Sequence, residues 1–341
     1  MPLVLAIAVL LARGAAPAAA PTLAPATVLT RFIADEAHQG VAVDDRYFYA
    51  IDNSAIGKYD KRTGKPVARW RGDPRLYPHI NSCVVEEARL VCAASNHPDV
   101  PMASSVEIFD TATLHHVRSI ALPPYPGSLT WIERHDGSWF ALFANYDQGH
   151  GGEPGHDHRW TLLMRLDDQF RPLQSWRFPD DVLTRFAPMS CSGGSWGDDG
   201  LLYVTGHTRG ELYAMRLPSA GTVLEHVATI PLATGGQAFG WDPDRRVLWS
   251  IDRARHAVAA SAVPAVARMN GAAEWARKSY FGSSNGSPSA CFQRRGPPPR
   301  AELSVALALM VRGSLQRTGW RGVCPTSSIP IRVRHFSITI S

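Results

Sequence analysis

Apolar stretches alternate with short turn-forming stretches in a unit that recurs along the chain. Each unit opens with a small or polar residue and an apolar strand, passes through an acidic or glycine-containing turn, and continues with a second strand rich in aromatic and aliphatic residues. The five copies of this hairpin cover residues 38–52, 79–96, 127–145, 192–207 and 236–252. Short apolar runs bounded by turn residues are typical of β-strands. The pattern therefore predicts five β-hairpins of similar design.

Further strands follow each hairpin. The pattern predicts a third strand at residues 56–59, 105–109, 161–166, 211–217 and 257–263, and a fourth at 66–70, 117–122, 173–178 and 225–232. Four antiparallel strands per unit, repeated at a spacing of roughly 40–65 residues, are the pattern of propeller blades.

The fifth unit lacks a fourth strand, and the other end of the chain offers one. Residues 28–33 precede the first unit and alternate like an outer strand. Adding this strand to the fifth unit closes the ring and hides the open sheet edges. We therefore predict an all-β, five-bladed β-propeller over residues 27–264, closed by an N-terminal outer strand. An open β-sandwich of the same strands is the alternative, and the strand count favours the propeller.

Five stretches carry a resemblance to a known family. They lie at residues 38–44, 57–64, 125–131, 200–207 and 236–242. Through them the sequence resembles the bacterial exported propellers, related to lactonase and quinoprotein-like repeat proteins, that carry the label cycloisomerase. The resemblance covers residues 28–264 and implies a lactone-type substrate, without a defined mechanism. A looser resemblance, through His38-Gln-Gly, is to the five-bladed glutaminyl cyclases.

A ligand site is expected at one end of the central channel. In a blade the first strand starts, and the second strand ends, at the same rim, which we call the top face. Polar residues gather at both places, and a buried polar ring needs water, metal or ligand as partner. The alternative is that these residues only bond loop backbone groups.

Roles at the top face follow from residue chemistry. His38 and His79 are the predicted general acid and base, because imidazole titrates near neutral pH. Asp52, Asp147 or Asp252 would orient the imidazole or hold a cation. The predicted substrate-binding residues are Gln39, Asn81, Ser128, Ser192, His207 and Gln237. The predicted ligands of a divalent ion, calcium or zinc, are Asn145, Asp147 and Asp252.

These residues predict an exported enzyme that opens or closes the ring of a small, lactone-type metabolite. The alternative is a non-catalytic periplasmic propeller that uses the same face to bind a ligand or another protein.

The longest irregular connection lies in the third unit, at residues 147–158. Its side chains His150, His156, Asp157 and His158 are candidate zinc or copper ligands. Their spacing matches no standard site, and the four glycines favour a solvated, flexible loop.

The cysteines and one serine motif add little chemistry. Cys83 and Cys92 fall opposite each other if Glu87 and Ala88 form a two-residue turn; we favour two buried thiols, with a cross-strand disulfide as the alternative. Cys191 would be a nucleophile only with His207 or His79 beside it. Residues 193–197 match the G-x-S-x-G pattern, but a β-strand follows where the motif needs a helix.

Charge and the chain ends complete the picture. Apolar residues are 45% and charged residues 19%, as in a folded protein. The net charge of +5 comes from residues 270–341, which hold 10 Lys and Arg against 2 Asp and Glu. The main domain is therefore not a nucleic-acid-binding protein. No apolar run reaches the roughly 18–20 residues that span a bilayer, so no transmembrane segment is expected. Separately, we expect the protein to be a monomer.

Residues 1–18 are typical of a signal peptide, with Ala16 and Ala18 fitting cleavage before Ala19. This predicts a periplasmic or secreted protein. Because the segment lacks the positively charged residues that begin a signal peptide, the alternative is a wrongly assigned start codon and no export. Residues 265–341 show no blade pattern. They indicate a disordered basic extension or, as we favour, an out-of-frame translation, and cutting after Pro264 should leave the propeller folded.

Overall fold

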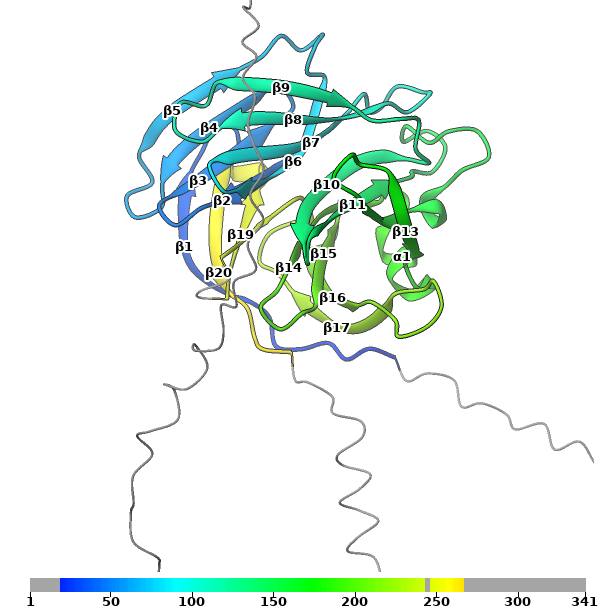
Figure 1. The fold of residues 1–341 in the computed structure, drawn as a ribbon. Coiled ribbons are helices and arrows are strands. Elements are labelled where there is room, and N and C mark those ends of the chain that lie inside the picture. The colour runs from blue at the N-terminus through cyan, green and yellow to red at the C-terminus, as the bar shows by residue number, and fades with distance from the viewer. Residues whose placement is uncertain (1–18, 243–245, 267–341) are drawn as a thin grey trace, which may run out of the picture. The chain divides into compact units, whose positions relative to one another are not determined.

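The computed structural model describes residues 19–242 and 246–266. They form five four-stranded antiparallel sheets arranged as the blades of a β-propeller (Figure 1). The predicted fold is confirmed. The predicted leader at 1–18, the tail from 267 onward and the turn at 243–245 lie outside the described residues.

The strands follow the predicted order, from the innermost to the outermost in each blade. Blade 1 holds β2 (Gly40–Val43), β3 (Tyr47–Asp52), β4 (Ala55–Asp60) and β5 (Pro66–Arg71). Blade 2 holds β6 (His79–Glu86), β7 (Arg89–Ser95), β8 (Ser104–Asp110) and β9 (His116–Ala121). Blade 3 holds β10 (Ser128–His135), β11 (Ser138–Ala144), β12 (Leu162–Leu166) and β13 (Pro172–Arg177). Blade 4 holds β14 (Cys191–Trp196), β15 (Leu202–Gly206), β16 (Glu211–Arg216) and β17 (Glu225–Pro231). Blade 5 holds β18 (Gly240–Asp242), β19 (Val247–Asp252), β20 (Ala257–Ala262) and β1 (Thr27–Ile33).

The ring closes through β1. This strand pairs antiparallel with β20, from Thr27 opposite Ala262 to Ile33 opposite Ala257, and lies beside it in Figure 1. The segment before β1 runs along blade 4, where the Leu23 amide donates to the Thr229 carbonyl at 2.8 Å. The start of the described chain therefore holds two neighbouring blades together.

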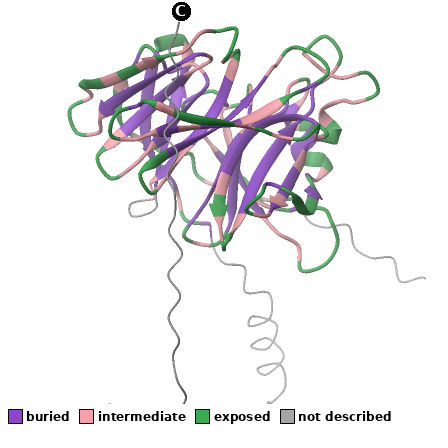
Figure 2. Cartoon of the chain, turned by 45° about the horizontal axis from the view of Figure 1, so that its top comes forward, coloured by how far each residue is buried: buried purple, intermediate pink, exposed green. Residues whose placement is uncertain are grey.

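Burial decreases from the channel outward. The second strands are almost wholly buried, whereas the outermost strands β5 and β9 are mostly exposed (Figure 2). Side chains of adjacent blades pack face to face, as Phe48 of blade 1 does on Trp249 of blade 5, with ring centroids 5.4 Å apart. These packed faces fix the angle between blades and so position the strand ends.

In the described ranges, three short helices interrupt the blades. They are η1 (His158–Trp160), α1 (Asp180–Phe186) and η3 (Arg253–Arg255). The pattern of residues did not predict α1, which fills the space beside blades 3 and 4 with Val182, Leu183 and Phe186. None of the helices in the described ranges is long and apolar enough to cross a membrane.

Candidate functional site

His79 stands at the start of β6, on the top face. Its pKa is lowered to about 4, first by burial and then by the electrostatic influence of His97, Arg253 and His207. These groups come from blades 2, 4 and 5. Mutual influence among them shows that the ring of blades gathers basic side chains at this mouth of the channel. At neutral pH the imidazole of His79 is therefore uncharged.

Arg253 supplies the fixed positive charge of this cluster. It begins η3, directly after β19, and burial lowers the pKa of its guanidinium while Asp52 opposes that shift. Within the described ranges, no carboxylate lies within 4.0 Å of it. Nη1 instead donates to Nε2 of His207 at 3.4 Å. An accepting Nε2 leaves the proton on Nδ1 of His207.

His207 is thus held neutral beside a cation. Burial first, and then the Arg253 charge, lower its pKa to about 4. Gln237 donates to the His207 carbonyl at 3.3 Å, which fixes the end of β15.

His38 lies against a carboxylate. Its Nδ1 is 3.3 Å from Oδ1 of Asp52, and its ring stacks on His256. The same carboxylate accepts from the Asn53 amide, and Asn53 accepts from the side chain of Gln39 at 2.7 Å. Asp52 therefore orients one imidazole and also acts on Arg253, so that His38 belongs to the same mouth.

His97 is a member of the cluster that the sequence did not reveal. Its ring packs 5.2 Å from the ring of His79 and 4.6 Å from that of Tyr146. Its Nε2 lies 3.1 Å from the carbonyl of His150, in the long loop of blade 3. Gly151 has a φ of +85°, and a Cβ there would come within 2.9 Å of His97 Nε2, so this close approach needs glycine.

A β-bulge recurs where the innermost strands start. The register shifts around Asn81 in β6, Thr130 in β10 and Ser192 in β14. Bulges redirect side chains and are common beside functional sites. Here Asn81 turns toward the neighbouring blade and donates to the Leu129 carbonyl at 2.8 Å.

The three predicted metal ligands have partners within the protein. Asn145 donates to the Pro126 and Trp160 carbonyls, and Asp252 accepts from Arg255 at 2.7 Å. Asp147 accepts from Nδ1 of His158 at 2.6 Å. Two atoms are buried without a hydrogen-bond partner among the described residues: Oδ1 of Asn145, and Oγ of Ser128, which was predicted to bind substrate.

One group in the described part of the chain places three possible metal-ligand atoms within 4.8 Å. It consists of Asp147, Asp157 and His158 in the long loop, and so includes one of the three predicted ligands. Asp157 is half-buried and is also held by Arg159, whose Nη2 donates to it at 2.5 Å. Ion pairing of this kind competes with a metal for the carboxylate.

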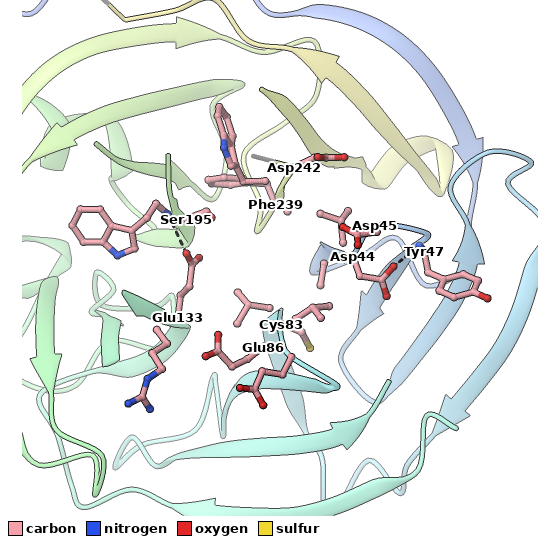
Figure 3. A pocket seen from close by; sticks show the side chains of 18 of the residues that line it. Asp44, Asp45, Tyr47, Cys83, Glu86, Glu133, Ser195, Phe239 and Asp242 are labelled. Carbon is pink, nitrogen blue, oxygen red and sulfur yellow. Dashed lines mark hydrogen bonds between the residues drawn. The ribbon is translucent and has the colours of Figure 1, made fainter. Parts of the chain in front are cut away.

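A cavity of about 600 Å³ lies at the other mouth of the channel, where the innermost strands end (Figure 3). None of the predicted site residues lines it. Its acidic rim includes Asp44, Asp45, Glu86 and Glu87, which the sequence marks only as turn residues. Glu133 of β10 faces the same space, and burial raises its pKa to about 7.

The cysteines depart from the favoured prediction. Cys83 and Cys92 are directly opposite in β6 and β7, as the two-residue turn predicts, but they form a disulfide. Two free thiols were the wrong choice, because directly opposed strand positions bring the side chains within bonding range.

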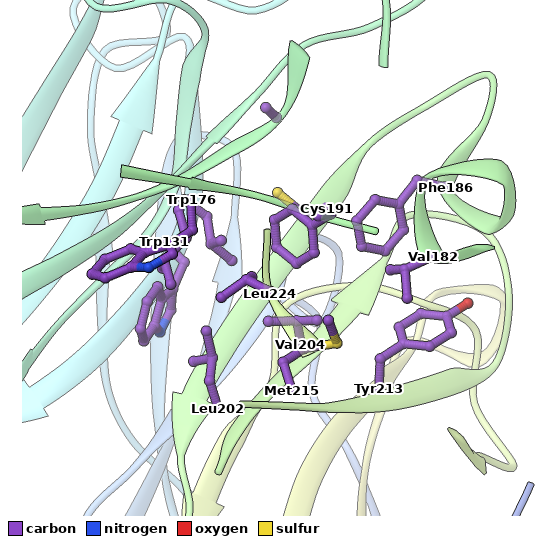
Figure 4. Close-up of a cluster of buried hydrophobic side chains, with 14 of the residues drawn as sticks. Trp131, Trp176, Val182, Phe186, Cys191, Leu202, Val204, Tyr213, Met215 and Leu224 are labelled. Carbon is purple, nitrogen blue, oxygen red and sulfur yellow. The ribbon is translucent and has the colours of Figure 1, made fainter. Parts of the chain in front are cut away.

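Cys191 lies in the core between blades 3 and 4 (Figure 4). Burial raises the pKa of this thiol to about 11, and its polar neighbour is the Thr130 hydroxyl at 3.6 Å. It is therefore a protonated core residue rather than a nucleophile. The G-x-S-x-G stretch starts within β14 and is not followed by a helix, as expected.

No protein-family model and no curated protein matches the sequence. Among solved structures, the chain is similar to the glutaminyl cyclase of Myxococcus xanthus, with 11% identity and a TM-score of 0.46 over 70% of this chain and 97% of that one. It is also similar to a chain of the mitotic checkpoint complex (9% identity, TM-score 0.38, 77% and 99% coverage). A third similar structure is a protein of unknown function from Bacteroides caccae (12% identity, TM-score 0.33, 57% and 60% coverage).

Proposed function

We propose that the protein is an exported propeller that acts on a small, carboxylate-bearing lactone at its top face. The observation that carries this proposal is the Arg253 guanidinium, which has no carboxylate partner within the described ranges and stands among neutral imidazoles. An anionic ligand supplies the missing counter-charge through charge-assisted hydrogen bonds. The Cys83–Cys92 disulfide supports export, since disulfides persist in oxidising compartments.

His38 and Asp52 form the base of the proposed reaction. Asp52 faces Nδ1, so the reactive nitrogen is Nε2, which takes a proton from water. The resulting hydroxide adds to the lactone carbonyl carbon. The ring C–O bond then breaks, and the leaving oxygen takes the proton back from His38 to give a hydroxy acid.

His79 has a different role from the one its residue type first indicates. An imidazole with a pKa of about 4 is a weak base at neutral pH, but its N–H still donates a hydrogen bond. We assign it to the lactone carbonyl, where it stabilises the developing negative charge. His38 therefore carries out both proton transfers, and His79 stabilises the charge that develops on the carbonyl oxygen.

The test uses the full chain with γ-lactones that differ only in carrying or lacking a carboxylate. Turnover is followed by proton release at constant pH. We expect hydrolysis of the carboxylated lactone, loss of at least about 100-fold in kcat in His38→Gln, and a raised KM in Arg253→Gln. Arg255→Gln is the matched control, because Arg255 is already paired with Asp252. Absence of lactone turnover by the unmodified chain would contradict the enzymatic proposal.

The second candidate is a non-catalytic propeller that binds the same class of anion. It is favoured by the protein partners of Gln39, Asn81 and Asp252, which show much of the polar ring engaged in holding loops. In that case Arg253→Gln weakens binding, while His38→Gln leaves the affinity unchanged and no lactone is consumed.

A further inference from the structure

We propose that the cavity at the other mouth of the channel is a second binding site, for an organic cation that carries an ammonium group on an aromatic body. It lies at the opposite ends of the innermost strands from the Arg253 cluster, and it does not depend on the proposed function. Its volume of about 600 Å³ is in the range of small-molecule sites.

The charge of the lining is negative and largely uncompensated. Two carboxylates are engaged: Asp44 accepts from the Tyr49 hydroxyl at 2.7 Å, and Asp242 pairs with Lys61 at 2.7 Å. In the part of the chain that the structure describes, four have no Lys, Arg or His within 4.0 Å, namely Asp45, Glu86, Glu87 and Glu133. Two arginines also line the cavity, and both have carboxylate partners outside its lining: Arg46 lies 3.9 Å from Asp60, and Arg134 is paired with Asp168.

Glu133 is the central carboxylate of the site. It projects from β10 toward the space drawn in Figure 3 and accepts from the Trp196 amide at 3.3 Å. Burial raises its pKa, the Ser195 hydroxyl and the Trp196 amide oppose the shift, and the charge of Glu86 adds to it. Arg134 acts on Glu86 rather than on Glu133. A bound cation would therefore stabilise a carboxylate that the protein leaves short of positive charge.

Aromatic side chains form part of the wall, beside aliphatic and small residues. Trp196 of β14 and Trp241 of β18 line the cavity, and they are only 8% and 7% exposed. Both indole Nε1 atoms lack a hydrogen-bond partner in the described ranges. Phe239 also lines the cavity, whereas the ring of Tyr47 points away from it in Figure 3. Carboxylates beside aromatic rings favour an ammonium ion on an organic body, through ion pairing and cation–π contact.

The spacing of the carboxylates favours an organic cation over a bare metal ion. A metal needs several ligand atoms close together. Within the described ranges, the group of three acidic or histidine side chains that meets this condition lies in the loop around Asp147, not among the cavity carboxylates.

The experiment is calorimetric titration of the full chain at pH 8 with three indoles of one size. Tryptamine carries an ammonium group, tryptophol a hydroxyl and indole-3-acetate a carboxylate. We expect tryptamine to bind at least tenfold more tightly than tryptophol, and indole-3-acetate not to bind. Glu133→Gln and Glu86→Gln should each weaken tryptamine at least tenfold, while Asp35→Asn, which removes an exposed carboxylate paired with Arg69, should leave it unchanged.

Three results would overturn the proposal: no heat with tryptamine, equal affinity for tryptamine and tryptophol, or displacement of tryptamine by calcium at stoichiometric concentration. The Arg253→Gln variant should bind tryptamine with unchanged affinity. The proposal for this cavity and the proposal for the top face are therefore tested separately. A repeat at pH 7 in HEPES and in phosphate should show proton release on binding, absent in Glu133→Gln.

Discussion

Arg253 donates to Nε2 of His207 across 3.4 Å, and the two residues directly follow the second strands of blades 5 and 4. This contact joins adjacent blades at the top face. It uses one N–H of the guanidinium and leaves the others for an anion, while it holds His207 in a single neutral form. The relationship makes Arg253 the anchor on which the top-face proposal depends.

Arg253→Gln should weaken binding of a carboxylated ligand about 10–100-fold, since a hydrogen bond to a charged group contributes roughly 1.5–3 kcal/mol. The pKa of His207 should rise in this variant, because Arg253 lowers it in the unmodified chain. Imidazole titration by NMR measures that shift. Arg255→Gln, next to Asp252 in the same helical turn, should change neither property.

Folding stability should fall on acidification through the histidines of this face. The folded pKa of His79 and of His207 is about 4, below the ordinary 6.5, so the unfolded chain binds more protons between these values. Their contribution is complete above pH 6.5 and is lost as the pH falls toward 4. We expect a loss on the order of 3 kcal/mol for each histidine, at about 1.4 kcal/mol per pKa unit.

Urea unfolding of the unmodified chain and of His79→Gln, between pH 7 and pH 4, measures this effect. The variant should show a shallower dependence of the free energy of unfolding on pH. Equal slopes for both proteins would mean that His79 is solvated and titrates normally.

Reduction should destabilise the propeller through the Cys83–Cys92 disulfide. The bond joins residues nine apart, and closing a loop of that size contributes about 2–3 kcal/mol in the chain-entropy account. A reducing agent should lower the urea midpoint of the unmodified chain and of Cys191→Ala alike. The double variant Cys83→Ala, Cys92→Ala should start lower and not respond. A midpoint indifferent to reductant would rule out the bond.

The last described residues decide where the propeller ends. Val263 and Val266 pack with Leu201 and Phe239 in one buried cluster, so a chain cut after Pro264 lacks a buried valine. A chain ending at Val266 should melt close to the full chain. One ending at Pro264 should still fold but lose about 1.5 kcal/mol, the value of burying such a side chain. Scanning calorimetry of the two truncations, side by side, separates them.

The architecture could be predicted from the sequence because each strand appears as a short run of apolar residues bounded by turn residues. Strand ends, the turn between Glu86 and Arg89, and the closing strand at Thr27–Ile33 all follow from runs of apolar residues and turn signals. The state of Cys83 and Cys92 was not accessible in this way: register places the two sulfurs opposite each other, but register alone does not say whether they are bonded.

The candidate site was only partly predictable. His38, His79 and His207 were placed at one rim because they stand at strand starts or ends. His97 and Arg253 were missed because each falls one residue outside the hairpin stretch predicted for its blade, at 79–96 and 236–252, whereas His207 ends the stretch 192–207. Likewise, the pattern predicts acidic turns in several blades, but only closure of the ring shows that these turns surround one cavity.

Glu133 provides a test in which stability and binding change in opposite directions. Its folded pKa of about 7 lies above the ordinary 4.5, so the charged form is disfavoured by folding and stability is lost as the pH rises from 4.5 through 7. Glu133→Gln removes that cost. The variant should be more stable than the unmodified chain at pH 8, by on the order of 3 kcal/mol at about 1.4 kcal/mol per pKa unit, and equal to it near pH 4. Urea unfolding at the two pH values measures the difference, with Asp35→Asn as the control.

A carboxylate retained for structure would give the opposite sign, because its removal would then destabilise the fold at pH 8. Stabilisation combined with loss of tryptamine binding is the result expected of a group kept for a ligand at the expense of the fold.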